Sequence, residues 1–334
     1  MNKEEKNSTA TQPQLMSTFV AGFNTVANNI YLIILPVLFD LFLWFGPHFR
    51  LKEFLSPVIT NSINSMSEMN IADFSPAIES AKEIWPLIVE RFNLVGAIST
   101  FPIGVPSLLA GQGTLLNPIG TPQMIEINSS GNAFLLALVF IILGIILGAL
   151  YFGLIAQSSQ GRKLQISLAK LGDQALQSLI LTLFLILLAI VIAIPTLFII
   201  SLLALISPTV AQIALFAISF IILWTIIPLA FAPHGIFAFD FKFSKSILTS
   251  VKLVRYFLPS TGIFLLLCLV FTQGLNVLWQ TPPETSWMLL IGIFGHAFIS
   301  TGLIAASFDY YQKGMLWMQA RIQTLSNNQM IENH

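Results

Sequence analysis

The sequence predicts an all-α polytopic membrane protein with six transmembrane helices and two cytoplasmic interfacial amphipathic helices. Hydrophobic residues make up 55% of the 334 residues and charged residues only 9%, with a mean hydropathy of +0.83. Soluble domains carry about 25% charged residues, so this composition excludes an ordinary soluble fold. Six apolar stretches reach the roughly 20 residues that a helix needs to cross hydrocarbon. The lysines and arginines gather in alternate connections between those stretches, as they do in membrane proteins.

The chain divides at changes in polarity. Residues 1–18 are polar and mixed in charge, which predicts a disordered cytoplasmic tail. The apolar run at 19–46 is too long for the core of a signal peptide, and no small-residue cleavage pattern closes it, so we expect an uncleaved first transmembrane helix. An extracytoplasmic insertion is expected at 47–131, five further helices within 132–308, and a cytoplasmic tail at 309–334.

The expected boundaries of the five later helices are 133–156, 178–206, 212–232, 259–279 and 287–308. We expect Pro36 to kink the first helix, because proline removes a backbone donor. Ser207 and Pro208 predict a tight turn between the third and fourth helices. Gly144 and Gly148 form a small-xxx-small pattern, which favours the close approach of another helix.

The distribution of cations predicts the orientation. Basic residues lie in both tails and in the second-to-third and fourth-to-fifth connections, whereas the third-to-fourth and fifth-to-sixth connections have none. With six crossings, all basic segments and both termini fall on one side, which is then cytoplasmic. The acidic insertion at 47–131 falls on the other side. We therefore expect a plasma-membrane protein, and a bacterial inner membrane is the expected site.

The stretch 241–271 begins as a basic amphipathic segment and ends as an apolar span. On a helix, one face carries Lys245, Thr249, Lys252 and Tyr256, and the opposite face carries Ile247, Val251, Val254 and Leu258. Such a helix lies among headgroups with its cations on anionic lipid. Pro259 predicts a corner into the next span. The expected contacts with the anionic inner leaflet are Lys245, Lys252, Arg255, Lys163 and Lys170.

The insertion at 47–131 is expected to be partly helical and membrane-associated, and it is a candidate surface for protein partners. Ser75 followed by Pro76 is typical of a helix start. The apolar stretch 92–109 contains Pro102, Gly104 and Pro106, which argue against a seventh crossing. A re-entrant or surface-lying loop that packs onto the helices is the favoured interpretation, because irregular backbone at membrane depth must be buried or face water.

Two basic segments, within residues 166–188 and 248–269, align without gaps at an offset of 82 positions. Lys170 then matches Lys252, and Ser178 matches Ser260. Each copy would be a basic amphipathic helix that runs into a span, which is a parallel repeat. The alternative is that any two leucine-rich segments align this well.

The segments FDFKFSKSILTSVKLVRYF and IAASFDYYQKGMLW carry a resemblance to known families. On them, residues 195–317 resemble the membrane domain attached to some bacterial glycerophosphodiester phosphodiesterases, and related six-span families such as the YciC-like proteins. The resemblance implies a six-span architecture. It implies no activity, because nothing in the chain matches the catalytic carboxylates and histidines of the soluble phosphodiesterase barrel.

Four polar residues within or beside the spans are candidates for an intramembrane polar site: Asp40, His296, Asn28 and Gln273. Asp40 could instead reach the outer interface beside Trp44, and His296 could make a single interhelical hydrogen bond. The chain's histidines show no His-x-x-x-His or Glu-x-x-His spacing, so we expect no metal site. We also expect no catalytic residue, no cofactor and no nucleic-acid partner.

These observations leave three hypotheses about function. The first is a non-enzymatic accessory or lipid-interacting membrane protein, favoured because residues suited to catalysis are scarce. The second is a permease for a small solute or lipid, favoured by the proline-broken spans and the repeat. The third, an intramembrane enzyme, has the least support. A hydrated cavity shared by Asp40, His296 and the asparagines would distinguish the permease from the accessory protein.

Overall fold

A computed structural model describes residues 13–68 and 75–332 of the chain, and it is 78% helical. Five helices are long and apolar enough to cross a membrane, and a sixth span is formed if two consecutive helices near the amino terminus are counted together. Two three-residue strands, β1 (His48–Arg50) and β2 (Met124–Glu126), pair in parallel. The chain is therefore an all-α polytopic membrane protein, which confirms the predicted fold class.

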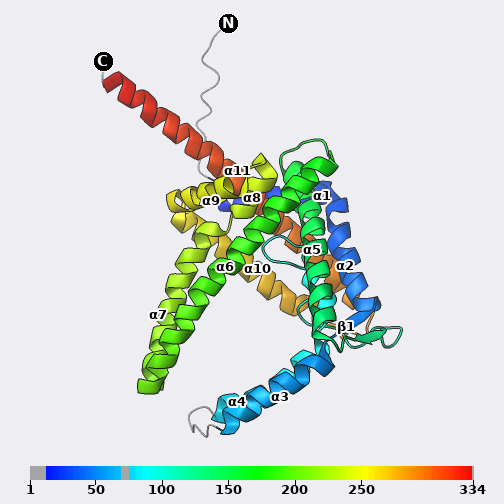
Figure 1. Cartoon of the computed structure of the whole chain (residues 1–334). Helices are drawn as coiled ribbons and strands as arrows, with labels where there is room; N and C mark the ends of the chain where they lie inside the picture. The colour runs from blue at the N-terminus through cyan, green and yellow to red at the C-terminus, as the bar shows by residue number, and fades with distance from the viewer. Residues whose placement is uncertain (1–12, 69–74, 333–334) are drawn as a thin grey trace. The chain divides into compact units, whose positions relative to one another are not determined.

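Two compact units make up the chain. Within the described residues, unit 1 comprises 13–29, 152–271 and 301–332, and unit 2 comprises 30–68, 75–151 and 272–300. Unit 1 contains α1 (Leu15–Asn28), α6 (Leu168–Ile206), α7 (Pro208–Ile226), η4 (Ile227–Leu229), α8 (Ala232–Phe239) and α9 (Phe243–Tyr256). Unit 2 contains η1 (Ile30–Ile33), α2 (Ile34–Phe45), α3 (Lys52–Glu68), α4 (Ser75–Arg91) and η3 (Leu94–Ile98). Three helices contribute to both units: α5 (Ser130–Ser159), α10 (Leu258–Trp279) and α11 (Leu289–Glu332) (Figure 1).

The first predicted span is broken at Asn29, not at Pro36. Helix α1 ends at Asn28, and the next helical segment, η1, begins at Ile30. The Asn29 side chain donates to the Thr25 carbonyl at 2.8 Å, which satisfies a carbonyl that the end of α1 leaves free. Pro36 lies in the first turn of α2, where a helix needs no backbone donor. The predicted kink at Pro36 is therefore wrong, because this proline occupies the one part of a helix that tolerates it.

The long helices α6 and α7 form the predicted hairpin, with Ser207 as the only residue between them (Figure 1). However, α6 begins at Leu168, ten residues before the expected start of its span at Ser178. The basic segment before the span is thus continuous with α6 and is not a separate interfacial helix. In the proposed repeat, Gln177 aligns with Pro259, and only the proline interrupts the backbone donors. The two copies therefore differ where the sequence suggested that they match.

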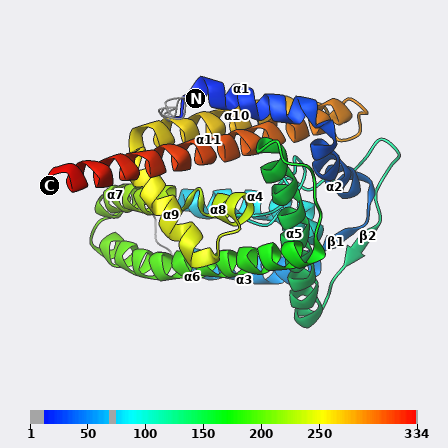
Figure 2. The same cartoon turned by 90° about the horizontal axis from the view of Figure 1, so that it is seen from above.

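The second predicted interfacial helix, α9, is separate from α10, and the two run in different directions on either side of Phe257 (Figure 2). The buried side of α9 is not purely apolar, as the sequence had suggested, because it includes Ser246 and Ser250, which are fully buried. The Ser246 hydroxyl donates to the Ala232 carbonyl, and the Ser250 hydroxyl donates to the Pro228 carbonyl at 2.7 Å. Polar residues occupy this side because the η4–α8 break leaves carbonyls that need donors.

The carboxyl-terminal tail continues the last span. Helix α11 runs from Leu289 to Glu332, and Tyr310 and Tyr311 are fully buried within unit 1. The Tyr310 ring stacks on Phe264 at 4.7 Å between ring centroids and lies 5.5 Å from Phe231. The two tyrosines therefore belong to an aromatic core of unit 1, although tyrosines that follow a span are also typical of the headgroup level.

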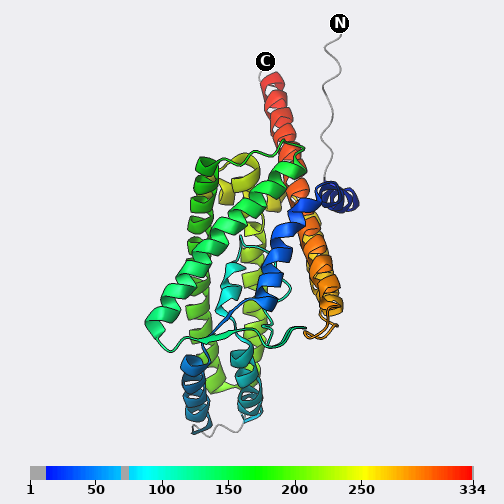
Figure 3. The same cartoon turned by 90° about the vertical axis from the view of Figure 1, so that its right-hand side faces the viewer.

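In unit 2, the insertion begins with a helix pair. Helices α3 and α4 lie side by side (Figures 1 and 3). Ile78 and Val89 of α4 are buried, but Trp85, Leu87 and Ile88 are 44%, 60% and 46% exposed. The insertion is thus partly helical, with apolar side chains left at the surface of α4.

Candidate functional site

Asp40 on α2 is the most deeply buried charged side chain of unit 2 among the described residues, with no exposed surface. Its carboxylate accepts three hydrogen bonds from one loop. The donors are the hydroxyl of Ser107, the N–H of Leu108 at 3.0 Å and the N–H of Leu109 at 3.2 Å. Asp40 therefore does not reach the interface beside Trp44. It holds the loop against α2 through charge-assisted hydrogen bonds.

Ser107 organises the turn that Asp40 holds. Its hydroxyl oxygen also accepts from the N–H groups of Leu109 at 3.2 Å and Ala110 at 2.9 Å. A serine that caps the turn following it is a common local arrangement. Ser107 therefore fixes the turn that supplies the donors around the carboxylate, and the arrangement stabilises the loop without a bound ligand.

The stretch 92–109 is described throughout and contains no helix long enough to cross a membrane, since its one helical segment is η3. Instead, this stretch packs on the small-residue pattern of α5. A Cβ atom added at Gly144 would lie 2.4 Å from the Ile98 carbonyl oxygen, and one added at Gly148 would lie 2.7 Å from the Ile103 carbonyl oxygen. The two glycines therefore allow a loop, not another helix, to approach α5 closely.

The loop contacts α5 at Gly144, which is the midpoint of the predicted span 133–156. The contact therefore lies in the middle of the apolar length of α5. Its backbone is satisfied locally. The Thr100 hydroxyl donates to the Ile103 carbonyl at 2.8 Å, and the Ser99 hydroxyl donates to the Val105 carbonyl at 2.9 Å. Buried backbone must find such partners when water is excluded.

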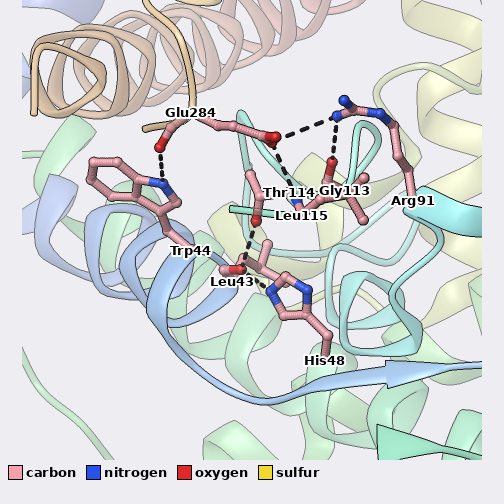
Figure 4. A network of polar contacts seen from close by, with 8 residues as sticks. All are labelled: Leu43, Trp44, His48, Arg91, Gly113, Thr114, Leu115 and Glu284. Atoms are coloured by element: carbon pink, nitrogen blue, oxygen red, sulfur yellow. Dashed lines mark hydrogen bonds and ion pairs between the residues drawn. The ribbon is translucent and has the colours of Figure 1, made fainter. Parts of the chain in front are cut away.

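Glu284, from the connection between α10 and α11, joins three segments of unit 2 (Figure 4). Its carboxylate lies 3.6 Å from the Arg91 guanidinium and accepts from the Leu115 N–H at 3.2 Å. Its backbone carbonyl accepts from the Trp44 indole N–H at 2.8 Å. Arg91 also donates to the Gly113 carbonyl at 3.2 Å. The network links α2, the end of α4 and residues 113–115, which follow the turn that Asp40 binds.

His48 lies in the same network and is 2% exposed. Its Nε2–H donates to the Leu43 carbonyl at 2.9 Å, and the Thr114 hydroxyl donates to the same oxygen at 3.3 Å. Burial lowers the pKa of His48 below its ordinary value of 6.5, and the Arg50 charge lowers it further, against the opposing effects of the Leu43 carbonyl and Glu284. The neutral form is therefore the one that fits this site.

Within unit 2, the predicted polar residues His296 and Gln273 do not join Asp40 in one site. The His296 Nδ1–H donates to the Asn276 side-chain oxygen at 2.9 Å, which is the single interhelical hydrogen bond given above as an alternative. The side chain of Gln273 is exposed. Asn28 is exposed and belongs to unit 1. Among the described residues of unit 2, the hydrogen bonds of Asp40 and of His296 go to separate partners.

The basic residues of unit 1 are arranged differently. Lys245, Lys252 and Arg255 of α9 are exposed, and none forms an ion pair with a carboxylate in the described part of the chain. Lys245 lies over the Phe241 ring at 4.0 Å. Leu248 and Tyr256 are also exposed on this helix, at 61% and 62%. The free surface of α9 thus combines cations with apolar groups.

Lys163 is exposed, whereas Lys170 is partly buried and pairs with Asp240 at 2.8 Å. Asp240 also accepts from the Gln174 amide at 3.1 Å. It ends α8 in the left-handed conformation, with φ of +52°, which aspartate adopts more readily than most residues. Of the five predicted lipid contacts, four are exposed, and Lys170 partly serves to hold the α8–α9 junction to α6.

Arg162, Lys163 and Lys170 line a cleft of about 330 Å³ together with Gln157, Gln165 and Ser167. This cleft, and the place of Arg162 in it, were not predicted from the sequence. The Arg91–Glu284 pair, whose members are 193 positions apart, was not predicted either. Glu284 is the only charged residue in the connection QTPPETS, and this was the one feature of the sequence that could have indicated its role in the network.

In the described part of the chain, no three His, Cys, Asp or Glu side chains are close enough together to hold a metal ion. Comparison with protein-family models, with curated proteins and with solved structures finds no match to this chain. The fold therefore defines the class, an all-α integral membrane protein, and the resemblance to six-span families remains an expectation.

Proposed function

We propose that this protein is a non-enzymatic integral membrane protein that binds the anionic inner leaflet through α9 and acts as an accessory or lipid-interacting component of a plasma membrane. The observation that carries this proposal is the free surface of α9. Lys245, Lys252 and Arg255 are exposed there without carboxylate partners among the described residues, beside exposed Leu248 and Tyr256. Cations mixed with apolar groups are what a helix at headgroup level needs.

Packing supports the same assignment, because α9 is held in place by its opposite side. Leu253 and Val254 have no exposed surface, and the serine hydrogen bonds tie α9 to the η4–α8 break. The cations are therefore presented by a fixed helix. Each basic residue near an anionic membrane surface contributes about 1 kcal/mol of attraction. Three such residues are enough to enrich anionic lipid around the protein.

The test is the lipid that stays with the full-length protein during purification in a neutral detergent from membranes of mixed phosphatidylglycerol and phosphatidylcholine. Wild-type protein should retain an excess of phosphatidylglycerol over the bulk membrane, and this excess should fall with added salt. The triple variant K245Q/K252Q/R255Q should lose most of it. Equal retention by the variant and the wild type would contradict the proposal.

A permease is the second candidate, and one observation favours it. The end of η3 and the non-helical stretch 99–104 that follows it lie against the middle of α5, and interrupted backbone at such a depth is a feature of transport proteins. Against it, the hydroxyls of Ser99 and Thr100 satisfy this loop, and Asp40 is fully used in holding it. Loss of solute uptake in His296→Ala at normal abundance would favour the permease, since His296 takes no part in the loop.

The exposed apolar side chains of α4 make the 47–131 insertion a candidate surface for protein partners. Trp85, Leu87 and Ile88 lie on one helix and are each at least 44% exposed. Crosslinking from Trp85→Cys in a Cys268→Ser background, compared with Glu79→Cys on the same helix, would test it. A partner crosslinked only from position 85 would support this surface.

A further inference from the structure

The cleft between the end of α5 and the start of α6 is lined only by polar residues, half of which are cations. Its lining consists of Gln157, Arg162, Lys163, Gln165, Ser167 and Lys170. Lys170 is compensated by Asp240, but neither Arg162 nor Lys163 forms an ion pair in the described part of the chain. Two uncompensated cations in a polar cleft favour an anion.

The wall of the cleft is held in place by its own hydrogen bonds. The Gln157 side-chain oxygen accepts from the Gln165 N–H at 2.8 Å, and the Gln157 carbonyl accepts from the Arg162 N–H at 3.0 Å. Gly161 turns the chain between them with φ of +62°. These contacts fix the backbone on both sides of Lys163, so the two cations project from an ordered turn.

The start of α6 adds donors to the cleft. Ser167 is its N-cap residue, and the Ser167 side chain makes no capping hydrogen bond. The first N–H groups of this 39-residue helix therefore have no side-chain acceptor at the cap, and the positive end of the helix dipole lies there. Arginine, lysine, a hydroxyl and a helix N-terminus together form the usual set of donors for phosphate.

The segment that lines the cleft is extended and alternates in polarity. Lys163, Gln165 and Ser167 line the cleft, whereas Leu164 and Ile166, which lie between them, do not line it. Leu164, Ile166 and Leu168, the first residue of α6, are exposed at 44%, 66% and 83%. One side of the segment thus suits a phosphate and the other suits hydrocarbon.

From this arrangement we infer that the cleft binds the phosphate of an anionic phospholipid, with the acyl chains beside Leu164, Ile166 and Leu168. The inference rests on the proposed function, because it requires this side of unit 1 to lie at headgroup level. It adds a defined site for one lipid to the general attraction of α9. The volume of about 330 Å³ is large enough for a phosphate headgroup.

The experiment is native mass spectrometry of the full-length protein, delipidated and titrated with phosphatidylglycerol or phosphatidylcholine. One tightly bound phosphatidylglycerol per chain is expected, with at least tenfold weaker binding of phosphatidylcholine. R162Q/K163Q should weaken the phosphatidylglycerol site at least tenfold. K52Q/K82Q is the matched control, because it removes two exposed positive charges of the insertion, outside both the cleft and α9, and should leave this site unchanged. Equal weakening in both variants would overturn the inference.

A second arm separates a lipid from a free anion. Inorganic phosphate is titrated into the same proteins, with phosphorus NMR line broadening as the readout, and Ile166→Ser is included. Weak phosphate binding lost in R162Q/K163Q, together with lipid binding weakened by Ile166→Ser, supports the lipid site. Phosphate binding as tight as lipid binding and unaffected by Ile166→Ser would overturn the lipid assignment.

The two proposals can fail separately. If K245Q/K252Q/R255Q retains its full excess of phosphatidylglycerol while R162Q/K163Q loses the single bound lipid, the role of α9 is wrong and the cleft is right. If only the α9 variant loses lipid, the proposed function stands and the cleft is overturned.

Discussion

The charged groups of the two units are used in opposite ways. In unit 2, three charged side chains bind partners within the same unit. Asp40 binds the turn at Ser107, Arg91 pairs with Glu284, and Arg50 pairs with Glu126 at 3.2 Å. In unit 1, Lys163 and the three cations of α9 are exposed without carboxylate partners in the described part of the chain. The difference indicates that these charges of unit 2 maintain structure, as Lys170 and Asp240 do in unit 1, whereas Lys163 and the three cations of α9 remain available for a ligand.

The largest expected effect comes from Asp40→Ala. Removal of the carboxylate leaves the Ser107 hydroxyl and the buried Leu108 N–H without an acceptor, each costing about 1–3 kcal/mol, whereas the Leu109 N–H keeps the Ser107 oxygen as an acceptor. The free energy of unfolding should fall by about 3 kcal/mol or more, measured by denaturation in mixed micelles. The exposed Lys252→Gln is the control and should stay within about 0.5 kcal/mol of wild type. Similar stabilities for the two variants would remove the contrast between the units.

A pair of glycine variants tests the seat of the loop on α5. Gly144→Ala places a Cβ atom 2.4 Å from the Ile98 carbonyl, whereas Gly172 in α6 has no atom within 4 Å of the added carbon. Overpacking should lower the free energy of unfolding by about 2 kcal/mol for Gly144→Ala. Gly172→Ala should raise it by up to about 1 kcal/mol, because alanine favours the helix. If both variants stabilise, the loop does not rest on α5.

His48 predicts a pH dependence of smaller size. Because its pKa is lowered in the folded protein, the unfolded chain binds more protons below pH 6.5. The stability of unit 2 should therefore be full above pH 6.5, fall as the pH drops through 6.5, and level off below the lowered pKa. His48→Gln can still donate to Leu43 but does not titrate, so it should flatten this part of the profile. An unchanged slope in the variant would assign the dependence to another group.

The smallest effect is expected for the Arg91–Glu284 pair, which is partly exposed at side-chain fractions of 47% and 23%. Solvent screens such a pair, so a double-mutant cycle with Arg91→Gln and Glu284→Gln should give a coupling of about 0.5 kcal/mol. Coupling above about 2 kcal/mol would show that the network is more strongly cooperative than its exposure implies.

Much of the fold follows from the sequence because spans are set by length and apolarity. The hairpin after Ser207, the corner at Phe257 and the separate basic helix α9 were all predictable from local signals. Other features depend on tertiary contacts. The break at Asn29 uses a side-chain bond to Thr25, and no pattern distinguishes that asparagine from Asn28. The same holds for Tyr310, which is as typical of an interface as of an aromatic core.

The candidate sites were predictable in part. The cations of α9 were identified because they recur at helical spacing before a span. The partners of Asp40 lie 67 to 69 positions away along the chain, so its role in holding a loop has no local signature. The glycines of α5 were recognised as a close-approach surface, but the sequence could not show that a loop would occupy it.

The most direct test of the central claim, that the cations of unit 1 face the cytoplasmic leaflet while the 47–131 insertion faces the other side, is sided labelling of single cysteines. Ser244→Cys beside the α9 cations and Ser65→Cys in α3 are both exposed positions and would be introduced into a Cys268→Ser background. A membrane-impermeant maleimide should label position 65 only from outside intact cells and position 244 only in inverted vesicles. Labelling of both positions from the same side would contradict the orientation and the lipid-binding role that depends on it.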